Sequence, residues 1–341
     1  MPLAPGEDIT AEELQLAARN HGMPLEALRH DVTPIGLHYL LIHYDIPIVD
    51  PGSYRLTIGD RELTLDEIHE RPRVTGPVTM ECAGNGRALL RPRALSQPWL
   101  LEAVGNAEWT GTPLKPLLDG ADCAEVLFTG IDRGVEGGEK QHYQRSLPLE
   151  DARGDDVLLA FELNGQPLPP QHGFPLRLLV PGWYGMTSVK WLTRIDFLDE
   201  PFTGYQNAAA YRMRQDEGDA GTPLSRIEPR ALMVPPGIPD FMTRRRFLEP
   251  GPTTLRGRAW SGYGAITRVE VDTGEGWREA SLGATHGWRA WSSEWDAAPG
   301  EHVLACRAFD ASGRCQPDAP PWNLGGYANN AVHRVPVTVN G

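Results

Sequence analysis

The sequence predicts a two-domain α+β protein: a mixed α and β domain over residues 1–224, followed by a β-sandwich over residues 225–341. The length of 341 residues is more than one hydrophobic core usually serves, which favours two or three domains. The 37 glycines and 31 prolines favour turns and short strands over long helices. The third observation is a change of sequence pattern near Pro223, where a proline-rich segment is followed by short runs of alternating apolar and polar residues.

The first domain is predicted to mix helices and strands without a regular βαβ alternation. An apolar stretch interrupted by Gly22 and Pro24 predicts a helix over residues 11–30. The other predicted elements are an extended region over 36–58, one or two helical turns over 65–70, a strand over 78–81 and buried strands over 157–161 and 176–180. The glycine-rich stretch 134–138 lacks the flanking pattern of a dinucleotide site and is interpreted as a flexible loop over a cleft.

The second domain shows the period-two alternation that is typical of half-buried strands. The predicted strands are 255–260, 267–271, 288–291 and 303–309. Turn residues separate them about every ten positions, which is the spacing of a β-sandwich. Six of the ten tryptophans lie in this part of the chain, and packing of the sandwich core is the preferred interpretation of their indoles.

Composition narrows the classes of function. A net charge of −13 argues against nucleic acid as a partner, because no basic stripe could neutralise a phosphate backbone. No apolar run approaches the roughly 18 residues that span a bilayer, and the sequence shows neither a signal peptide nor a twin-arginine pair, so a cytoplasmic location is expected. The four cysteines form no CxxC pair; Cys306 and Cys315 could be joined, but reduced thiols are favoured in a cytoplasm.

The segment Glu81-Cys-Ala-Gly-Asn-Gly-Arg87 is the first chemically informative motif. Cys82 ends a predicted strand and precedes small residues whose backbone other groups can approach closely. Arg87 can lower the pKa of the thiol and attract an anion, and a thiolate is a soft ligand for a redox-active metal. Taken alone, a single cysteine is more often a small buried hydrophobe.

A second group of polar residues punctuates the apolar strands further along the chain. His172 lies in a predicted loop, Arg177 begins a strand, and Lys190 lies in a following one. Three hydrogen-bond donors that converge on one cleft would suit the phosphate of a cofactor. Three scattered surface cations are the alternative.

With these motifs in this order, the sequence resembles the sulfite oxidase family of molybdenum-pterin enzymes. The shared stretches are Glu81-Cys-Ala-Gly-Asn-Gly-Arg87, residues 158–169, residues 172–177 and Val189-Lys-Trp191. The resemblance runs from about Gly36 to the end of the chain, and residues 260–271 look like the immunoglobulin-like dimerisation domain of that family. It therefore implies a sulfite-oxidase-type molybdopterin-binding domain, an immunoglobulin-like β-sandwich and a homodimer.

The resemblance also implies a role for individual residues. Cys82 would be the one protein ligand of a single molybdenum ion held on molybdopterin. The cofactor would be bound by Tyr39, His43, Cys82, Asp132, His172, Arg177, Ser188 and Lys190. The catalytic residues would be Cys82, Tyr143 and Arg87, and the substrate pocket would contain Arg87, Trp109, Tyr143 and Arg145.

The activity that the resemblance implies is the oxidation of sulfite to sulfate by oxygen-atom transfer at molybdenum. No segment resembles a haem domain, so the electrons would pass to an external acceptor, either a small cytochrome or dioxygen. Two departures bear on the substrate: Leu41 and Ala265 align with positions that carry pocket arginines in other members. Losing two cations would weaken the binding of a dianion unless His43 or Arg145 replaces them.

Two other functions remain open from the sequence. The same metal could serve a reductase of an S-oxide, an N-oxide or nitrate, which the missing arginines would permit. A cofactor-free binding module on the same fold is an alternative of a different class, although such a scaffold would not need Cys82 together with His172, Arg177 and Lys190.

Overall fold

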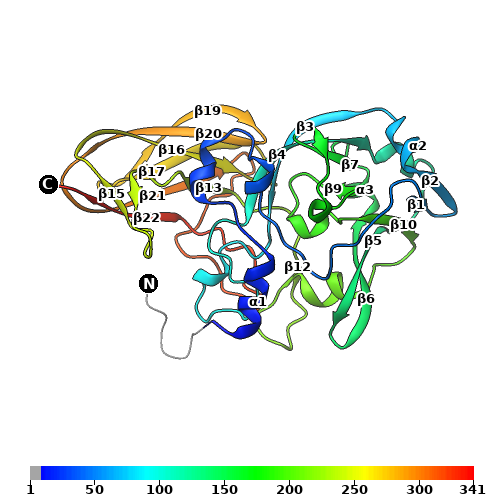
Figure 1. The fold of residues 1–341 in the computed structure, drawn as a ribbon. Helices are drawn as coiled ribbons and strands as arrows, with labels where there is room; N and C mark the ends of the chain where they lie inside the picture. Colours follow the sequence, from blue (N-terminus) through cyan, green and yellow to red (C-terminus); the bar gives the residue numbers. More distant parts are fainter. Residues whose placement is uncertain (1–8) are drawn as a thin grey trace.

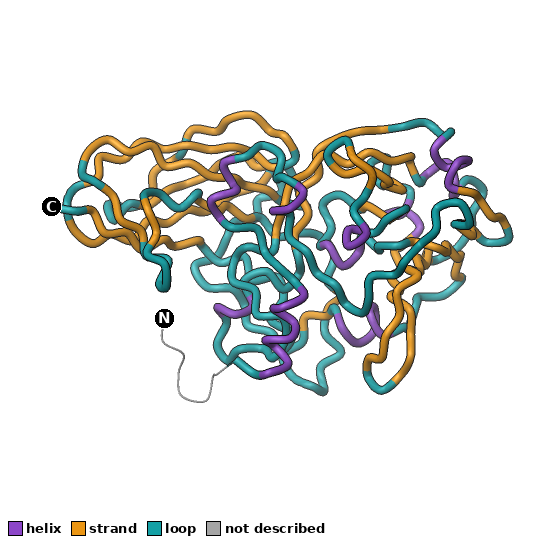
Figure 2. Tube along the Cα trace, in the orientation of Figure 1, coloured by secondary structure: helices purple, strands orange, loops and turns teal. Residues whose placement is uncertain are grey.

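The computed structural model describes residues 9–341, in which strands and loops dominate and helices are short (Figures 1 and 2). The α-helices of this part are α1 (Ala11–Arg19), α2 (Leu65–His69) and α3 (Leu149–Ala152). Single helical turns are formed by Leu25–Arg29, Ile35–Leu37, Arg87–Leu89, Lys115–Leu118, Pro170–His172, Gly185–Thr187 and Gln206–Ala210. Both α1 and α2 begin with a capping box, in which a threonine and a glutamate three residues later bond to each other's backbone N–H.

Two five-stranded sheets make up the first half of the chain. One has the order β2-β1-β10-β5-β6, with β1 (Arg55–Ile58), β2 (Arg61–Thr64), β5 (Glu125–Glu136), β6 (Glu139–Pro148) and β10 (Leu192–Leu198). The other has the order β3-β4-β7-β8 with β9 beside β7, and contains β3 (Val74–Glu81), β4 (Val104–Pro113), β7 (Leu158–Leu163), β8 (Gln166–Pro167) and β9 (Arg177–Leu179). Their apolar faces share one core, with Leu56 and Phe128 from the first sheet against Leu159 and Leu178 from the second.

The second half consists of two antiparallel-rich sheets that enclose a separate core. The first has the order β13-β16-β20-β19, with β13 (Arg230–Met233), β16 (Gly251–Trp260), β19 (Ser281–His286) and β20 (Trp288–Ala297). The second has the order β14-β15-β22-β21-β17-β18, with β14 (Ile238–Pro239), β15 (Arg246–Leu248), β17 (Ile266–Asp272), β18 (Trp277–Glu279), β21 (Gly300–Asp310) and β22 (His333–Val339). A short hairpin of β11 (Arg212–Met213) and β12 (Thr222–Pro223) precedes them.

An N-terminal segment joins the two halves. Residues 23–33 leave α1 and lie against β13 and β16, as the dark blue ribbon in Figure 1 shows. Leu28 is fully buried there with Leu232, Trp260 and Trp288. This segment belongs by sequence to the first half, yet its apolar side chains complete a core that the second half begins.

The structure confirms the predicted fold class and most of the predicted strands. Residues 78–81, 157–161 and 176–180 fall in or beside β3, β7 and β9, and the four strands expected after residue 250 lie within β16, β17, β20 and β21. Helical turns at 65–70 are also confirmed as α2. The predicted boundary at residue 224 lies between β12 and β13.

Three predictions for local structure are wrong. The helix expected over 11–30 ends at Arg19, because Asn20 is extended and a Cβ at Gly22 would collide with Glu102, so the chain must pass Glu102 as an open strand-like segment. Regular strand structure in the region 36–58 is limited to β1, since the earlier part is a loop. The expected loop at 134–138 is the end of a hairpin, because β5 and β6 continue to Glu136 and Glu139.

Two smaller findings complete the fold. In the described part of the chain, no helix combines the length and the apolar character needed to cross a bilayer. Cys306 and Cys315 are free, as are Cys82 and Cys123.

Candidate active site

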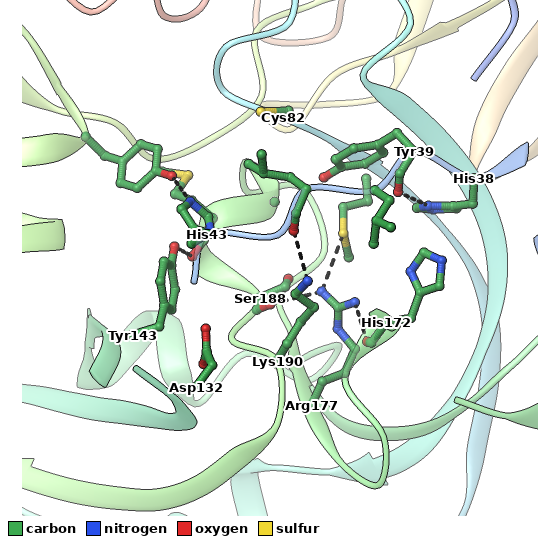
Figure 3. Close-up of a pocket in the computed structure, with 16 residues that line it drawn as sticks. His38, Tyr39, His43, Cys82, Asp132, Tyr143, His172, Arg177, Ser188 and Lys190 are labelled. Atoms are coloured by element: carbon green, nitrogen blue, oxygen red, sulfur yellow. Dashed lines mark hydrogen bonds between the residues drawn. The ribbon is translucent and has the colours of Figure 1, made fainter. Parts of the chain in front are cut away.

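A cleft divides into two compartments that meet at Cys82. The compartments share Leu41, His43, Cys82 and Tyr211. Figure 3 shows the inner compartment, with Cys82 at one end and the side chains of Arg177 and Lys190 at the other. The outer compartment has a volume of about 440 Å³.

The loop after β3 presents Cys82. The Cys82 N–H donates to Ala103 O (2.9 Å), and the Asn85 N–H donates to Cys82 O (3.0 Å), so the chain turns immediately after the strand. Gly84 leaves room for Arg87, since a Cβ would lie 2.7 Å from the guanidinium that packs over the loop and would displace it. Burial raises the pKa of the Cys82 thiol, while the Arg87 charge and the Gly84 N–H favour the thiolate.

Two buried cations line the far end of the inner compartment. Arg177 on β9 donates to His172 O and Ser188 O (both 2.9 Å), and Lys190 donates to Leu41 O (2.9 Å) and Gln171 O (3.1 Å). These partners are backbone carbonyls, which orient the cations without neutralising them. Burial lowers the pKa of Lys190 well below its usual value and that of Arg177 to about 10. The site would therefore gain from a bound anion.

Several buried polar atoms in this region have no partner in the described structure. They are His38 Nε2, Arg177 Nε and Thr187 Oγ1. Burial lowers the pKa of His172 to about 2 and that of His38 to about 4, so both imidazoles are neutral at physiological pH. A buried polar group without a hydrogen bond costs about 1–3 kcal/mol, and His38 and Arg177 line the inner compartment, so a polar ligand bound there would be favoured if it satisfied their free nitrogens.

Aromatic side chains form the wall beside Cys82. His43 Nε2 and Tyr211 Oη are 2.6 Å apart, and the His43 ring lies 4.7 Å from the ring of Tyr143. Tyr143 donates its hydroxyl to Met186 O (2.7 Å). Burial lowers the pKa of His43 to about 3, so its ring is a neutral hydrogen-bonding group rather than a cation.

Asp132 is the one carboxylate among the residues that line the inner compartment. Burial raises the pKa of Asp132 to about 7, although the nearby Lys190 charge favours ionisation. The carboxyl is thus positioned to hold a proton near neutral pH, or to accept a hydrogen bond from a ligand once ionised.

The outer compartment is rich in arginine. Arg19, Arg87, Arg212 and Arg214 line it, with Glu136 as the one acidic residue of that lining. Arg87 donates Nε to Gly325 O (2.8 Å) and Nη1 to Ser96 Oγ (3.1 Å), and its guanidinium lies 4.9 Å from the centre of the Tyr327 ring. These contacts fix the guanidinium at the cavity wall.

The second half of the chain supplies one wall of this compartment. The connection between β21 and β22 crosses back to the first half, so that Leu324, Gly325 and Tyr327 line the cavity. Two hydrogen bonds fix this connection: the Leu324 N–H donates to Arg214 O (2.8 Å), and the Ala328 N–H donates to Ala83 O (2.8 Å). The site is therefore built from both halves.

Most of the site residues expected from the sequence lie together in this cleft. The inner compartment is lined by Tyr39, His43, Cys82, Asp132, Tyr143, His172, Arg177, Ser188 and Lys190, and the outer one by Arg87. Neither Trp109 nor Arg145 is part of the lining, and neither is Ala265, the position that aligns with a pocket arginine of the family.

These three exceptions have clear structural reasons. Trp109 on β4 is fully buried beneath Arg177, with the guanidinium 5.0 Å from its ring. Arg145 lies behind the tyrosine wall and donates to Gln206 O and Leu224 O (3.0 Å), so it supports the segment that carries Tyr211. Ala265 lies in the β-sandwich, where its carbonyl accepts the Ala311 N–H.

Sequence reasoning also missed residues that line the outer compartment. They are Arg19, Trp99, Arg212, Arg214 and Tyr327, together with Tyr211, which both compartments share. Trp99 lies next to the Cys82 sulfur and favours its thiolate. No local pattern marks these positions, although Gly325-Gly326 before Tyr327 signals a close approach of backbone to another group.

Comparison with known protein families identifies two domains in this chain. The family described as oxidoreductase molybdopterin binding domain matches residues 43–206. The family described as Mo-co oxidoreductase dimerisation domain matches residues 239–340.

Named relatives cover most of the chain. Mitochondrial sulfite oxidase of Mus musculus is 35% identical over 90% of this chain and 62% of its own length, so the chain spans about three fifths of that relative. Sulfite oxidase of Arabidopsis thaliana is 31% identical over 89% of this chain and 87% of its own length. Among solved structures, the sulfane dehydrogenase SoxCD from Paracoccus pantotrophus is 27% identical, with a TM-score of 0.79 over 94% of this chain and 86% of that chain.

Proposed function

We propose that this chain, which belongs to the sulfite oxidase family of molybdopterin-binding oxidoreductases, oxidises sulfite to sulfate and passes the electrons to a separate acceptor. The observation that carries the proposal is the position of Cys82, whose thiol lies where a cation-lined compartment meets an arginine-lined one. One compartment fits an anionic cofactor and the other an anionic substrate, with a metal-binding sulfur between them.

The residues of the inner compartment fit a pterin with a phosphate. Arg177, Lys190 and the neutral His172 would hold the phosphate, since the hydrogen bonds of the two buried cations go to backbone carbonyls and not to carboxylates. Tyr39, Asp132 and Ser188 line the same space and would contact the pterin. Cys82 would be the protein ligand of one molybdenum ion. When bound, this group supplies oxygen-atom transfer and the storage of two electrons.

The outer compartment would collect and orient the substrate. Arg87 is fixed by three elements of the wall and directs charge toward the region of Cys82. Arg19, Arg212 and Arg214 add positive charge around the same cavity. They supply the positive charge that Leu41 lacks at a position where other members of the family carry an arginine. This distribution favours a small dianion over a neutral molecule.

Tyr143, His43 and Tyr211 would handle protons at the junction of the compartments. All three are neutral at physiological pH, and the His43–Tyr211 contact of 2.6 Å is a hydrogen bond between a neutral imidazole and a neutral phenol. Neutral donors stabilise charge that develops on an oxygen without competing with the arginines for the substrate.

The dimerisation domain supports a homodimer, and we propose that the chain acts as one. A small cytochrome or dioxygen would accept the electrons. The rival function is reduction of an S-oxide, an N-oxide or nitrate. One observation supports it: Leu41 lines both compartments and places an apolar side chain there.

The test uses protein purified from a host that makes the pterin. We expect about one molybdenum per chain, sulfite-dependent reduction of ferricyanide, and loss of both in Cys82→Ser, whose hydroxyl is a poorer ligand for this metal. Faster turnover of nitrate or a sulfoxide with reduced viologen would favour the rival function. Wild-type protein without molybdenum would refute the assignment.

A further inference from the structure

We propose that Arg230 and Trp260, both in the second half of the chain, are positioning residues for Cys82 and act through the carboxylate of Glu81. The proposal rests on the function proposed above, because it takes Cys82 as the protein ligand of the metal. It assigns the second half of the chain a part in metal binding that is separate from dimerisation.

Glu81 is the residue directly before Cys82, and it is only 1% exposed. Its Oε1 lies 2.7 Å from Nε of Arg230 on β13, and its Oε2 accepts the indole N–H of Trp260 on β16 at 2.7 Å. The Arg230 side chain is also 1% exposed, so this ion pair is removed from water. Both strands belong to the sheet β13-β16-β20-β19.

The same carboxylate organises the turn that presents the sulfur. Asn85 donates Nδ2 to Glu81 Oε1 (3.0 Å), and its Oδ1 accepts the N–H of Ala103 (3.0 Å). At the far side of the turn, Asn329 donates Nδ2 to Gly86 O (2.7 Å). The loop of residues 81–86 is therefore held at both ends by groups from the second half.

The physical reason for the coupling is the cost of a buried charge. Removing one partner of a buried ion pair leaves an uncompensated charge, which moves toward water or another partner if the structure allows it. Glu81 is covalently adjacent to Cys82, so its displacement would rotate the backbone that aims the sulfur into the cleft. Groups that orient a metal ligand change metal affinity by about 10–100-fold when they are altered.

Two variants separate positioning from simple stabilisation. Trp260→Phe removes one hydrogen bond to Glu81 and keeps the aromatic packing. The double variant Glu81→Gln with Arg230→Met removes both charges, so no lone charge is left buried, although the bonds of Arg230 to Asn85 O and Asn329 O are lost as well. Arg258→Met is the matched control, because Arg258 is a buried arginine of the same sheet that pairs with Asp31 and does not contact residues 81–87.

The experiment measures two properties of the full chain. In protein from a host that lacks the pterin, mass spectrometry follows the rate at which iodoacetamide alkylates Cys82. In protein from a competent host, the measurements are molybdenum retained on dialysis and the thiolate-to-metal absorption band.

We expect both test variants to change the alkylation rate and the loss of molybdenum by about tenfold and to shift the band, as removal of an orienting partner does. The Arg258→Met control should lower the melting temperature only. Unchanged alkylation, retention and spectrum in both folded test variants would overturn the proposal. If wild-type protein held no molybdenum, the proposed function would fail, whereas the alkylation rates would still decide whether Arg230 and Trp260 position the thiol.

Discussion

Replacement of Arg87 by methionine offers a direct measure of how the outer compartment binds its substrate. Arg87 donates Nε to Gly325 O and Nη1 to both Ser96 Oγ and Gln97 O. Its Nη2 has no hydrogen-bond partner among residues 9–341. One donor edge is therefore free for a substrate oxyanion. A hydrogen bond to a charged group contributes about 1.5–3 kcal/mol, which corresponds to about a tenfold to hundredfold change in kcat/KM.

The assay is steady-state sulfite oxidation with ferricyanide, with rates normalised to molybdenum per chain. The variant also loses contacts with the wall, so thermal unfolding must show that the protein remains folded at the assay temperature. Arg29→Met is the control, because Arg29 is exposed and lies outside both compartments. If Arg87→Met kept kcat/KM within about twofold of the wild type, binding of the anion by a charge-assisted bond at this position would be refuted.

Three further predictions follow from the hydrogen bonds and pKa shifts. Tyr211→Phe removes the 2.6 Å contact with His43, and we expect kcat/KM to fall by about threefold to tenfold in stopped-flow reduction; an unchanged rate would exclude a proton-handling role. Burial raises the pKa of Glu13, but the hydrogen bond and charge of Arg93 outweigh burial, so the net pKa is lowered. The Glu13–Arg93 pair therefore stabilises the fold above the ordinary carboxyl pKa, and this stabilisation is lost as the pH falls. Glu13→Gln should lower the free energy of unfolding in urea by about 3–5 kcal/mol at pH 7, and the difference from the wild type should shrink at low pH. Burial raises the pKa of Asp132 from 3.8 to about 7, so the cofactor-free protein loses stability as the pH rises through that range. Asp132→Asn should therefore stabilise the cofactor-free protein by up to about 4 kcal/mol at pH 8 and have little effect at pH 4. Equal effects of the variant at both pH values would contradict the pKa shift.

The parts of the site that the sequence predicted are those in which chemistry and local pattern coincide. Cys82 follows an apolar strand at a run of small residues, and Arg177 interrupts a strand that is otherwise apolar; Lys190, which was expected in a strand, lies in a bend just before β10. A charged group in such a setting must face a cavity or a partner, so its position is informative without any knowledge of the fold.

The parts that it missed depend on long-range packing. Trp109 and Trp99 are both buried aromatic residues near Cys82 in sequence, and only the path of β4 decides that Trp109 packs under Arg177 while Trp99 meets the sulfur. Likewise, nothing near Tyr327 in the sequence shows that the connection between β21 and β22 returns to the first half. Arg145 lies outside both compartments, because its distance from Tyr143 along a strand said nothing about the segment 206–211 that covers it.

The helix expected over residues 11–30 failed for a related reason. Gly22 and Pro24 interrupt its second half, and Met23 and Leu28 find their apolar partners across the junction with the β-sandwich. Tertiary packing overrides local preference in such a segment, and composition alone does not reveal the partner.

The N-terminal segment that joins the two halves also sets an order of events during synthesis on the ribosome. Asp31 O accepts the indole N–H of Trp288, a contact between residues 257 positions apart. At about 5–20 residues per second, the segment waits about 13–50 s before that partner is translated. The stretch with Leu324 and Tyr327 is translated later still, so the nascent cleft lacks one wall until that stretch has been made.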